Sequence, residues 1–402
     1  MQYNWINNVA NMSSDYTTIH FHDTFNKKIE PNTLPEKLTT LTFGYYFNQK
    51  IEPNILPNNV TTLIFSHLFN QKIGPNTLPK NLTTLIFRSL FNKKIELNSL
   101  PKNLKTLTFG DDFCRKIEPN TLPNSLTTLE FGYHFIRKIE PNTLPEKLTT
   151  LEFGYQFNQI IELNTLPDSL TTLTFGYKFN QKIEPNTLPK KLLILTFAWK
   201  FNQIIEPNIL PVSLTTLGFG WKFNQKIKLN TLPENLTSLT FGAKFNQKIE
   251  PNILPSNLTF LSFGWYFNQK IKLDTLPENL TNLTFGYHFN QKIDSEMLPS
   301  NLINIEFNWI CLEKNDSIKH HVEMVNNIPS YYHVKILLNK NKFDSGRSTK
   351  WPIHVIDYEE NKWSSEIYEI QDTYTHPIYG SSTILINKES YEPYSSSKSA
   401  LK

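Results

Sequence analysis

The stretch FNQKIEPNTLPKKLLILTFAWK, residues 179–200, decides the fold, because its pattern returns every 22 residues along most of the chain. Phenylalanine opens each copy, and no insertion separates one copy from the next. Isoleucine follows four residues later, leucine nine later and proline ten later, in all thirteen copies. The chain is therefore an array of one short unit. The opening residues are Phe25, Phe47, Phe69, Phe91, Phe113, Phe135, Phe157, Phe179, Phe201, Phe223, Phe245, Phe267 and Phe289.

Each unit contains one segment typical of a strand. In LTTLTF, residues 38–43, Leu41 and Phe43 alternate with Thr40 and Thr42, and this period of two predicts a short strand. The preceding segment often carries two prolines four residues apart, and these exclude a helix there. Glycine follows the second phenylalanine in nine of the thirteen copies, which predicts that a turn ends the strand.

A unit of 22 residues with one strand and an extended return lies in the length range of leucine-rich repeats. We therefore predict a mainly β protein, a right-handed solenoid of 22-residue leucine-rich-like repeats with one short parallel strand per repeat, capped at the C-terminus. Asparagine follows the opening phenylalanine in eleven units, which predicts a buried ladder of amides that satisfies turn backbone groups of the same and the next unit. Cys114 and Ile136 replace it in two adjacent units, where we expect a weak point.

Composition narrows the class of protein. The 402 residues include 29 Phe and 25 Pro but only four Ala, so a mainly helical fold is excluded. Forty basic and 36 acidic side chains give a formal charge of +4, too balanced to favour nucleic acid or an anionic membrane as partner. Cys114 and Cys311 are too few for a disulfide framework, and no leader or membrane-spanning run is present. These features predict a cytoplasmic monomer.

The F-N-Q-K-I motif followed by L-P-x-x-L-x-x-L-x-F-G resembles the FNIP repeat, a relative of leucine-rich repeats that is abundant in amoebae and in the giant viruses that infect them. The resemblance covers residues 16–307; Lys50 stands where the family often has proline. It implies a protein-interaction scaffold, located in the host cytoplasm if the protein is viral. Some members carry an F-box, but about fifteen residues precede the first strand, too few for that helical module.

The pattern divides the chain into five parts. Residues 1–15 are expected to cover the edge of the first coil, and residues 16–307 to form the solenoid. Residues 308–338 predict a longer, helix-containing terminal repeat, because apolar side chains recur there at helical spacing. Residues 339–393 predict a small β-rich capping region, and residues 394–402 a disordered tail.

Two sets of surface positions are candidates for partner binding. Strand side chains that face outward are mostly Thr, Ser or Asn, with the exceptions of Glu130, Glu152, Phe260 and the pair Ile64 and Ile86. The residue two after the second phenylalanine of a unit is usually Tyr or Trp, and we call these positions the aromatic column. Exposed Tyr and Trp are common in binding hot spots. The alternatives are sequence drift for the strand residues and mutual ring stacking over the turns for the aromatic column. The predicted partner-binding residues are Tyr133, Tyr155, Tyr177, Trp199, Trp221, Trp265, Glu130, Glu152 and Phe260.

The sequence gives little support for a catalytic site or a metal site. His20 and His22 alternate on one predicted strand face beside Asp23, but a third metal ligand is not evident. A lysine column three residues after the opening phenylalanine runs beside a glutamate column two residues further on, which favours a solvated charge ladder over a phosphate-tracking surface. We therefore expect no enzyme activity, no cofactor, no metal and no nucleic acid partner.

Two functions remain open at this point. The first is a non-enzymatic scaffold that binds a partner protein, whose identity is unknown, through the concave sheet and the aromatic column at its rim. The second is a substrate adaptor or enzyme whose specific activity resides in residues 308–402.

Overall fold

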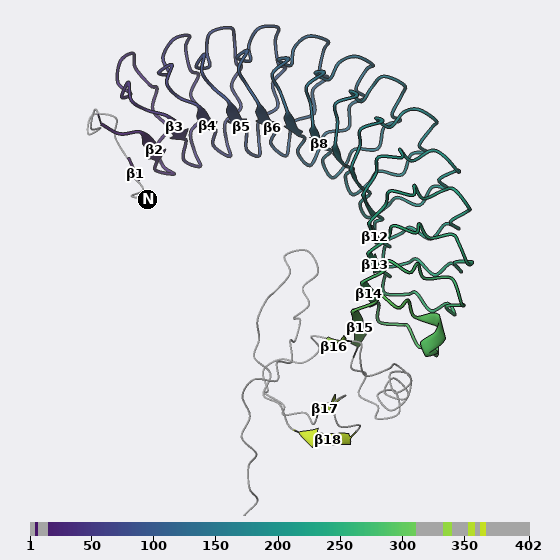
Figure 1. The fold of residues 1–402 in the computed structure, drawn as a ribbon. Coiled ribbons are helices and arrows are strands. Elements are labelled where there is room, and N and C mark those ends of the chain that lie inside the picture. Colours follow the sequence, from purple (N-terminus) through teal and green to yellow (C-terminus); the bar gives the residue numbers. More distant parts are fainter. Residues whose placement is uncertain (1–4, 7–14, 311–332, 340–352, 358–361, 367–402) are drawn as a thin grey trace, which may run out of the picture.

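The computed structural model describes residues 5–6, 15–310, 333–339, 353–357 and 362–366. The short strands stack in chain order into one parallel sheet, β1 to β16, and β17 pairs antiparallel with β18. Figure 1 shows the repeats stacked into an arc, with the strands on its inner, concave side and the connecting segments on its outer side. The predicted class is confirmed: a parallel β-solenoid with one strand per 22-residue repeat.

The strand bounds repeat with the period of the sequence. The strands are β1 (Trp5–Ile6), β2 (Thr18–Phe21), β3 (Thr40–Thr42), β4 (Thr62–Ile64), β5 (Thr84–Ile86), β6 (Thr106–Thr108), β7 (Thr128–Glu130), β8 (Thr150–Glu152), β9 (Thr172–Thr174), β10 (Ile194–Thr196), β11 (Thr216–Gly218), β12 (Ser238–Thr240), β13 (Phe260–Ser262), β14 (Asn282–Phe285), β15 (Asn304–Ile310), β16 (His333–Asn339), β17 (Ile353–Asp357) and β18 (Lys362–Glu366).

Register follows from the constant period. Leu41 pairs with Leu63, and the same 22-residue step relates partners from β2 to β15. Every position of the unit therefore forms a column of equivalent side chains across the sheet. A register slip by one residue would expose the whole apolar face, so burial of that face holds the alignment.

The core consists of columns of phenylalanine, leucine and isoleucine, and two of these columns are phenylalanine. Within a unit, the Phe43 and Phe47 rings stack with centroids 3.9 Å apart. Each ring also stacks on its equivalent in the next unit, as for Phe43 and Phe65 at 5.8 Å. Twenty-seven of the 29 phenylalanines lie in these columns, each at most 5% exposed. Truncating one to alanine would cost about 3–5 kcal/mol, because a buried ring leaves a cavity.

The glycine after the second phenylalanine has a different role from the one expected. Its backbone does not adopt the left-handed conformation that turns often require of glycine. Instead, its Cα packs against the carbonyl of the equivalent residue in the preceding unit. A Cβ on Gly176 would lie 1.7 Å from the Gly154 carbonyl oxygen. Glycine is favoured here because two backbones approach closely, and the turn itself follows at the next two residues.

A left-handed residue reverses the chain in the middle of each return segment. Asparagine occupies this position from Asn32 to Asn252, and Asp274 follows, with φ between 58° and 63°. Asn and Asp tolerate this conformation better than other residues with a side chain. In the last full unit Glu296 occupies this position. The return segment there forms the 3-10 helix η2 (Ser295–Met297) in place of the left-handed turn.

The two ends differ from the middle. β1 pairs parallel with β2, and β16 pairs parallel with β15 over seven residues. The helix expected within residues 308–338 falls on 311–332, outside the described residues, as does the tail 394–402. β17 and β18 lie within residues 339–393. None of the helical segments in the described part of the chain has the length and apolarity needed to cross a bilayer.

Candidate functional site

The concave face carries the outward side chains of the strands. In β3, for example, Thr40 and Thr42 are half-exposed while Leu41 between them is fully buried. The same alternation recurs in the strands that follow. The concave face therefore presents rows of hydroxyl groups, with neighbouring groups one strand spacing apart. A polar, uncovered sheet of this kind offers hydrogen bonds and little apolar area. The residues that depart from threonine therefore give it most of its chemical individuality.

Glu130 and Glu152 are brought side by side. They are aligned partners in β7 and β8, and both are exposed. The Thr108 hydroxyl donates to Glu130 Oε2 at 3.2 Å. Burial, and then the negative charge of Glu130, raise the pKa of Glu152. The pair is a local concentration of negative charge on an otherwise neutral stretch of the sheet.

The aromatic column forms a continuous stack. Tyr133, Tyr155 and Tyr177 stack with ring centroids 4.3 and 4.2 Å apart. Trp199 continues the stack at 5.2 Å from Tyr177, and Trp221 lies parallel to it at 4.5 Å. The rings therefore cover one another's faces, as the stacking alternative expected. Stacking leaves mainly the ring edges open to solvent: Tyr133 is 41% exposed, and the rings from Tyr155 to Trp221 are half-exposed. Tyr45, an earlier member of the column, is 43% exposed.

The stack bridges a gap in the sequence pattern. Ala243 occupies the column between Trp221 and Trp265, yet these two indoles meet edge to face with centroids 4.7 Å apart. Trp265 meets Tyr287 in the same way at 4.8 Å. The aromatic surface is thus unbroken from Tyr133 to Tyr287.

Phe260 lies apart from the acidic pair. It is on β13, 37% exposed, between Ser238 and Asn282 in the register. Ile64 and Ile86 are aligned partners and lie side by side. Ile194 on β10 is a further outward apolar residue, 38% exposed, that was not among the predicted exceptions. The predicted residues thus form two groups on neighbouring surfaces, with Phe260 separate on the concave face.

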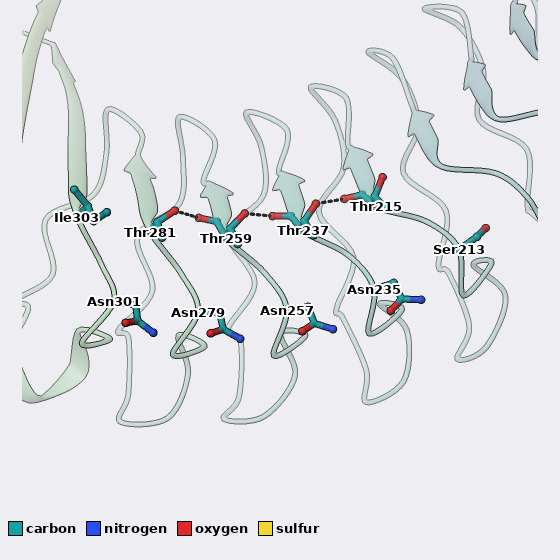
Figure 2. Close-up of a pocket in the computed structure, with 10 residues that line it drawn as sticks. All are labelled: Ser213, Thr215, Asn235, Thr237, Asn257, Thr259, Asn279, Thr281, Asn301 and Ile303. Carbon is teal, nitrogen blue, oxygen red and sulfur yellow. Dashed lines mark hydrogen bonds between the residues drawn. The ribbon is translucent and has the colours of Figure 1, made fainter.

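A shallow groove of about 720 Å³ runs along the start of the strands, and sequence reasoning missed it. Figure 2 shows a row of threonines beside a row of asparagines. From Thr237 to Thr281, each threonine hydroxyl donates to the carbonyl of the previous threonine, as Thr237 does to Thr215 at 3.1 Å. The Asn257 amide donates to the Glu234 carbonyl at 3.0 Å. The signal was the run of Asn at one position of four successive units, Asn235, Asn257, Asn279 and Asn301.

The asparagine ladder exists, but it is not buried. The Asn26 side-chain oxygen accepts from the backbone N–H of Asn48 at 2.9 Å, and Asn48 does the same for Asn70. These side chains are exposed or half-exposed. The backbone N–H of Cys114 donates to the Asn92 side-chain oxygen at 3.1 Å, but Cys114 has no amide oxygen to accept the next bond of the series. Arg137 Nε donates to the Cys114 carbonyl at 3.0 Å, as the Gln71 side chain does to the Asn48 carbonyl in an uninterrupted part of the ladder.

The expected charge ladder is present on the return segments. Lys138 Nζ lies 2.9 Å from Glu162 and 3.4 Å from Glu140, and Lys248 lies 2.8 Å from Glu250. All of these side chains are well exposed, so each pair contributes little stability. Among the described residues, no group of three His, Cys, Asp or Glu side chains could hold a metal ion. His22 Nδ1 instead lies 2.9 Å from the Thr24 hydroxyl.

The fold and its bare concave sheet define a solenoid repeat protein of the leucine-rich-repeat type. The FNIP repeat family matches residues 17–308 in a series of overlapping repeats, and the chain belongs to that family. It is similar to the crystal structure of CroV588, described as a novel circular LRR protein, with 47% identity and a TM-score of 0.75. That alignment covers 82% of this chain and 47% of the other, so this chain spans about half of its length.

An internalin, InlF, from Listeria monocytogenes also matches, at 15% identity and a TM-score of 0.42, over 79% of this chain and 82% of that one. Among curated proteins, none matches the chain.

Proposed function

We propose that this protein is a non-enzymatic scaffold that binds a partner protein through the concave sheet and the aromatic column. The observation that carries the proposal is the uncovered inner face of the sheet, whose outward side chains are half-exposed or exposed from β3 to β14. A repeat solenoid presents such a face as an extended binding surface. A leucine-rich-repeat-like solenoid is typically non-enzymatic, which supports this proposal.

The binding residues proposed are the acidic pair Glu130 and Glu152, Phe260, and the aromatic column from Tyr133 to Trp265. Exposed edges of Tyr and Trp combine apolar area with a polar handle, which is why such residues dominate binding hot spots. The acidic pair adds charge that would set the orientation of a bound partner more than its affinity.

The test is affinity capture from the native cell with the full-length chain, followed by mass spectrometry. The variants are Glu130→Lys with Glu152→Lys, and separately Trp199→Ser with Trp221→Ser. Leu229→Ser, on a return segment and 60% exposed, is the control. We expect the same partner to be captured by the wild type and by the control, and to be lost from both test variants. Capture that is unchanged in both test variants would overturn the proposed surface.

A further inference from the structure

A second lysine column lies beside the stacked aromatic rings, and it differs from the one in the charge ladder. Its members are the last residue of four successive units. We call this group the lysine rim: Lys178, Lys200, Lys222 and Lys244. Lys222 and Lys244 are exposed, and Lys178 and Lys200 are half-exposed.

The backbone fixes each member of the lysine rim next to the aromatic column. The N–H of Lys200 donates to the carbonyl of Tyr177 at 2.9 Å, and that of Lys222 donates to the carbonyl of Trp199 at 2.9 Å. The bond recurs from Lys244 to Trp221 at 2.8 Å. Four lysine residues are therefore held in order along the stack, one per repeat.

Nothing on the neighbouring columns neutralises this charge. On the strand side, the outward positions are Thr174, Thr196, Gly218 and Thr240. On the other side, the next two surface positions are Asn and Gln in each unit, as in Asn202 and Gln203. Within the described ranges, no carboxylate forms an ion pair with any lysine of the rim, whereas Lys182 and Lys248 of the other column are paired at 3.1 and 2.8 Å.

Like charges one repeat apart repel each other, so an uncompensated row of four costs stability that the paired column avoids. The aromatic neighbours add to its positive character. Their faces are covered by stacking, so the stack presents ring edges, which are the positive part of an aromatic quadrupole. The whole strip therefore offers positive charge and hydrogen-bond donors to anything that approaches it.

We propose that the lysine rim binds an acidic, extended segment of a partner protein, rich in Asp and Glu, laid along the aromatic column. This inference rests on the proposed scaffold function and names the chemistry of its partner. Three repeat steps of about 4.8 Å span about 14 Å, which roughly five extended residues would cover. Single-stranded nucleic acid fits less well, because its bases bind by stacking on open ring faces, and these faces are occupied.

The test measures binding of fluorescent probes to the full-length chain by anisotropy. The probes are a glutamate-rich peptide, its glutamine-rich counterpart and oligo(dT), at low and at high ionic strength. The test variant replaces Lys178, Lys200, Lys222 and Lys244 by Gln. The matched control replaces four lysines of the charge ladder by Gln, so that both variants lose the same net charge. Its positions are Lys116, Lys138, Lys182 and Lys248.

We expect the glutamate-rich peptide to bind the wild type and the control, and to bind the test variant at least about tenfold more weakly. High salt should reduce the wild-type affinity towards that of the test variant. Equal loss in both variants, no preference over the glutamine-rich peptide, or tighter binding of oligo(dT) would each overturn the inference. Circular dichroism of both variants checks that the β-rich fold is kept.

The same variants separate this inference from the function on which it rests. A cellular partner that is lost on Glu130→Lys with Glu152→Lys, but kept by the lysine-rim variant, would refute the acidic segment and leave the scaffold function standing. A partner that is lost in the lysine-rim variant and released from the wild type by excess glutamate-rich peptide would support both.

Discussion

The acidic pair shows how the charge of a single residue can oppose folding. Glu152 ionises less readily in the fold than in the unfolded chain, because burial and the charge of Glu130 raise its pKa. As pH rises through the ordinary Glu pKa of about 4.3, the unfolded chain loses this proton first. Ionisation of Glu152 therefore subtracts from stability above that pH, and the penalty is absent below it.

We accordingly expect Glu152→Gln to stabilise the protein at pH 7 by a few tenths of a kcal/mol, about the scale of an exposed cross-strand charge pair. The gain should shrink towards zero below about pH 4, where the wild-type carboxyl is protonated. Thermal or urea unfolding at several pH values measures it. In a Glu130→Gln background the gain should be smaller, and an unchanged gain would show that the two carboxylates do not interact.

Close backbone approach makes one glycine column sensitive to a single methyl group. Gly176→Ala would place a Cβ 1.7 Å from the Gly154 carbonyl oxygen. We expect a loss of about 1–2 kcal/mol, because the coils must move apart to admit it. Gly218→Ala is the control, since its Cβ would make an ordinary contact 3.6 Å from Thr196. Equal unfolding temperatures for the two variants would contradict this account.

Natural exceptions in that column indicate how the chain adapts. Ala198 replaces the glycine in one unit, and the turn bond from the Phe201 N–H to the Ala198 carbonyl is 3.5 Å long. The corresponding bond from Phe179 to Gly176 is 3.0 Å. Across the glycine units this bond reaches 3.3 Å, as from Phe135 to Gly132, so the turn that follows alanine is only slightly longer and the stack continues through it.

At the scale of the repeat, the asparagine ladder is interrupted once. It stops after the bond from Cys114 N–H to Asn92 and resumes at the bond from Asn180 N–H to Asn158 at 2.9 Å. Ile136 has no amide oxygen to accept from the Asn158 N–H, and its side chain is 43% exposed, so little packing depends on it. The interruption marks the coils we expect to open most easily.

Ile136→Asn should restore the missing acceptor and stabilise the protein by about 0.5–1.5 kcal/mol, the net worth of one hydrogen bond. Hydrogen exchange of the Asn158 amide should slow at the same time. Ile160→Asn is the matched control, because Ile160 is 57% exposed but lies outside the ladder. A similar gain in both variants would point to a general effect of removing surface isoleucine.

The sequence predicted the repeat unit well and its fine contacts less well. The 22-residue period and the alternation identified the strands and the core columns. This worked because the apolar residues of the pattern, Leu41, Phe43 and Phe47 and their equivalents, are the residues that are buried. The left-handed turn at Asn32 was overlooked, although an unvarying Asn or Asp column was its signal. The closeness of Gly176 to the preceding coil could not be inferred, because it depends on how tightly neighbouring backbones pack.

The candidate site was predictable to a similar degree. Alignment of the columns brought Glu130 beside Glu152 and stacked Tyr133 on Tyr155, as constant register requires. The contact of Trp221 with Trp265 across Ala243 was not predictable, because it depends on the reach and rotation of two indoles. Which ring surfaces stay open, and which lysines lack a partner, likewise required the three-dimensional contacts.

At the scale of the whole molecule, the arc should tolerate loss of complete coils. Deleting residues 47–68 joins Tyr46 to Phe69, the start of another unit, and leaves every column in register. We expect such a chain to keep its β-rich circular dichroism and its cooperative melt, with only a modest fall in melting temperature. Deleting residues 47–57, half a unit, should abolish cooperative melting, because apolar and polar columns then fall out of alignment. Similar melts for both deletions would contradict this expectation.

The unvarying 22-residue step has a further consequence for how such a gene can change. Every coil offers its neighbours the same two contact faces, so recombination between misaligned copies inserts or removes whole coils without disturbing those that remain. The reach of the arc, and the number of coils that carry a lysine or an indole at their edge, can therefore vary between generations while the protein still folds.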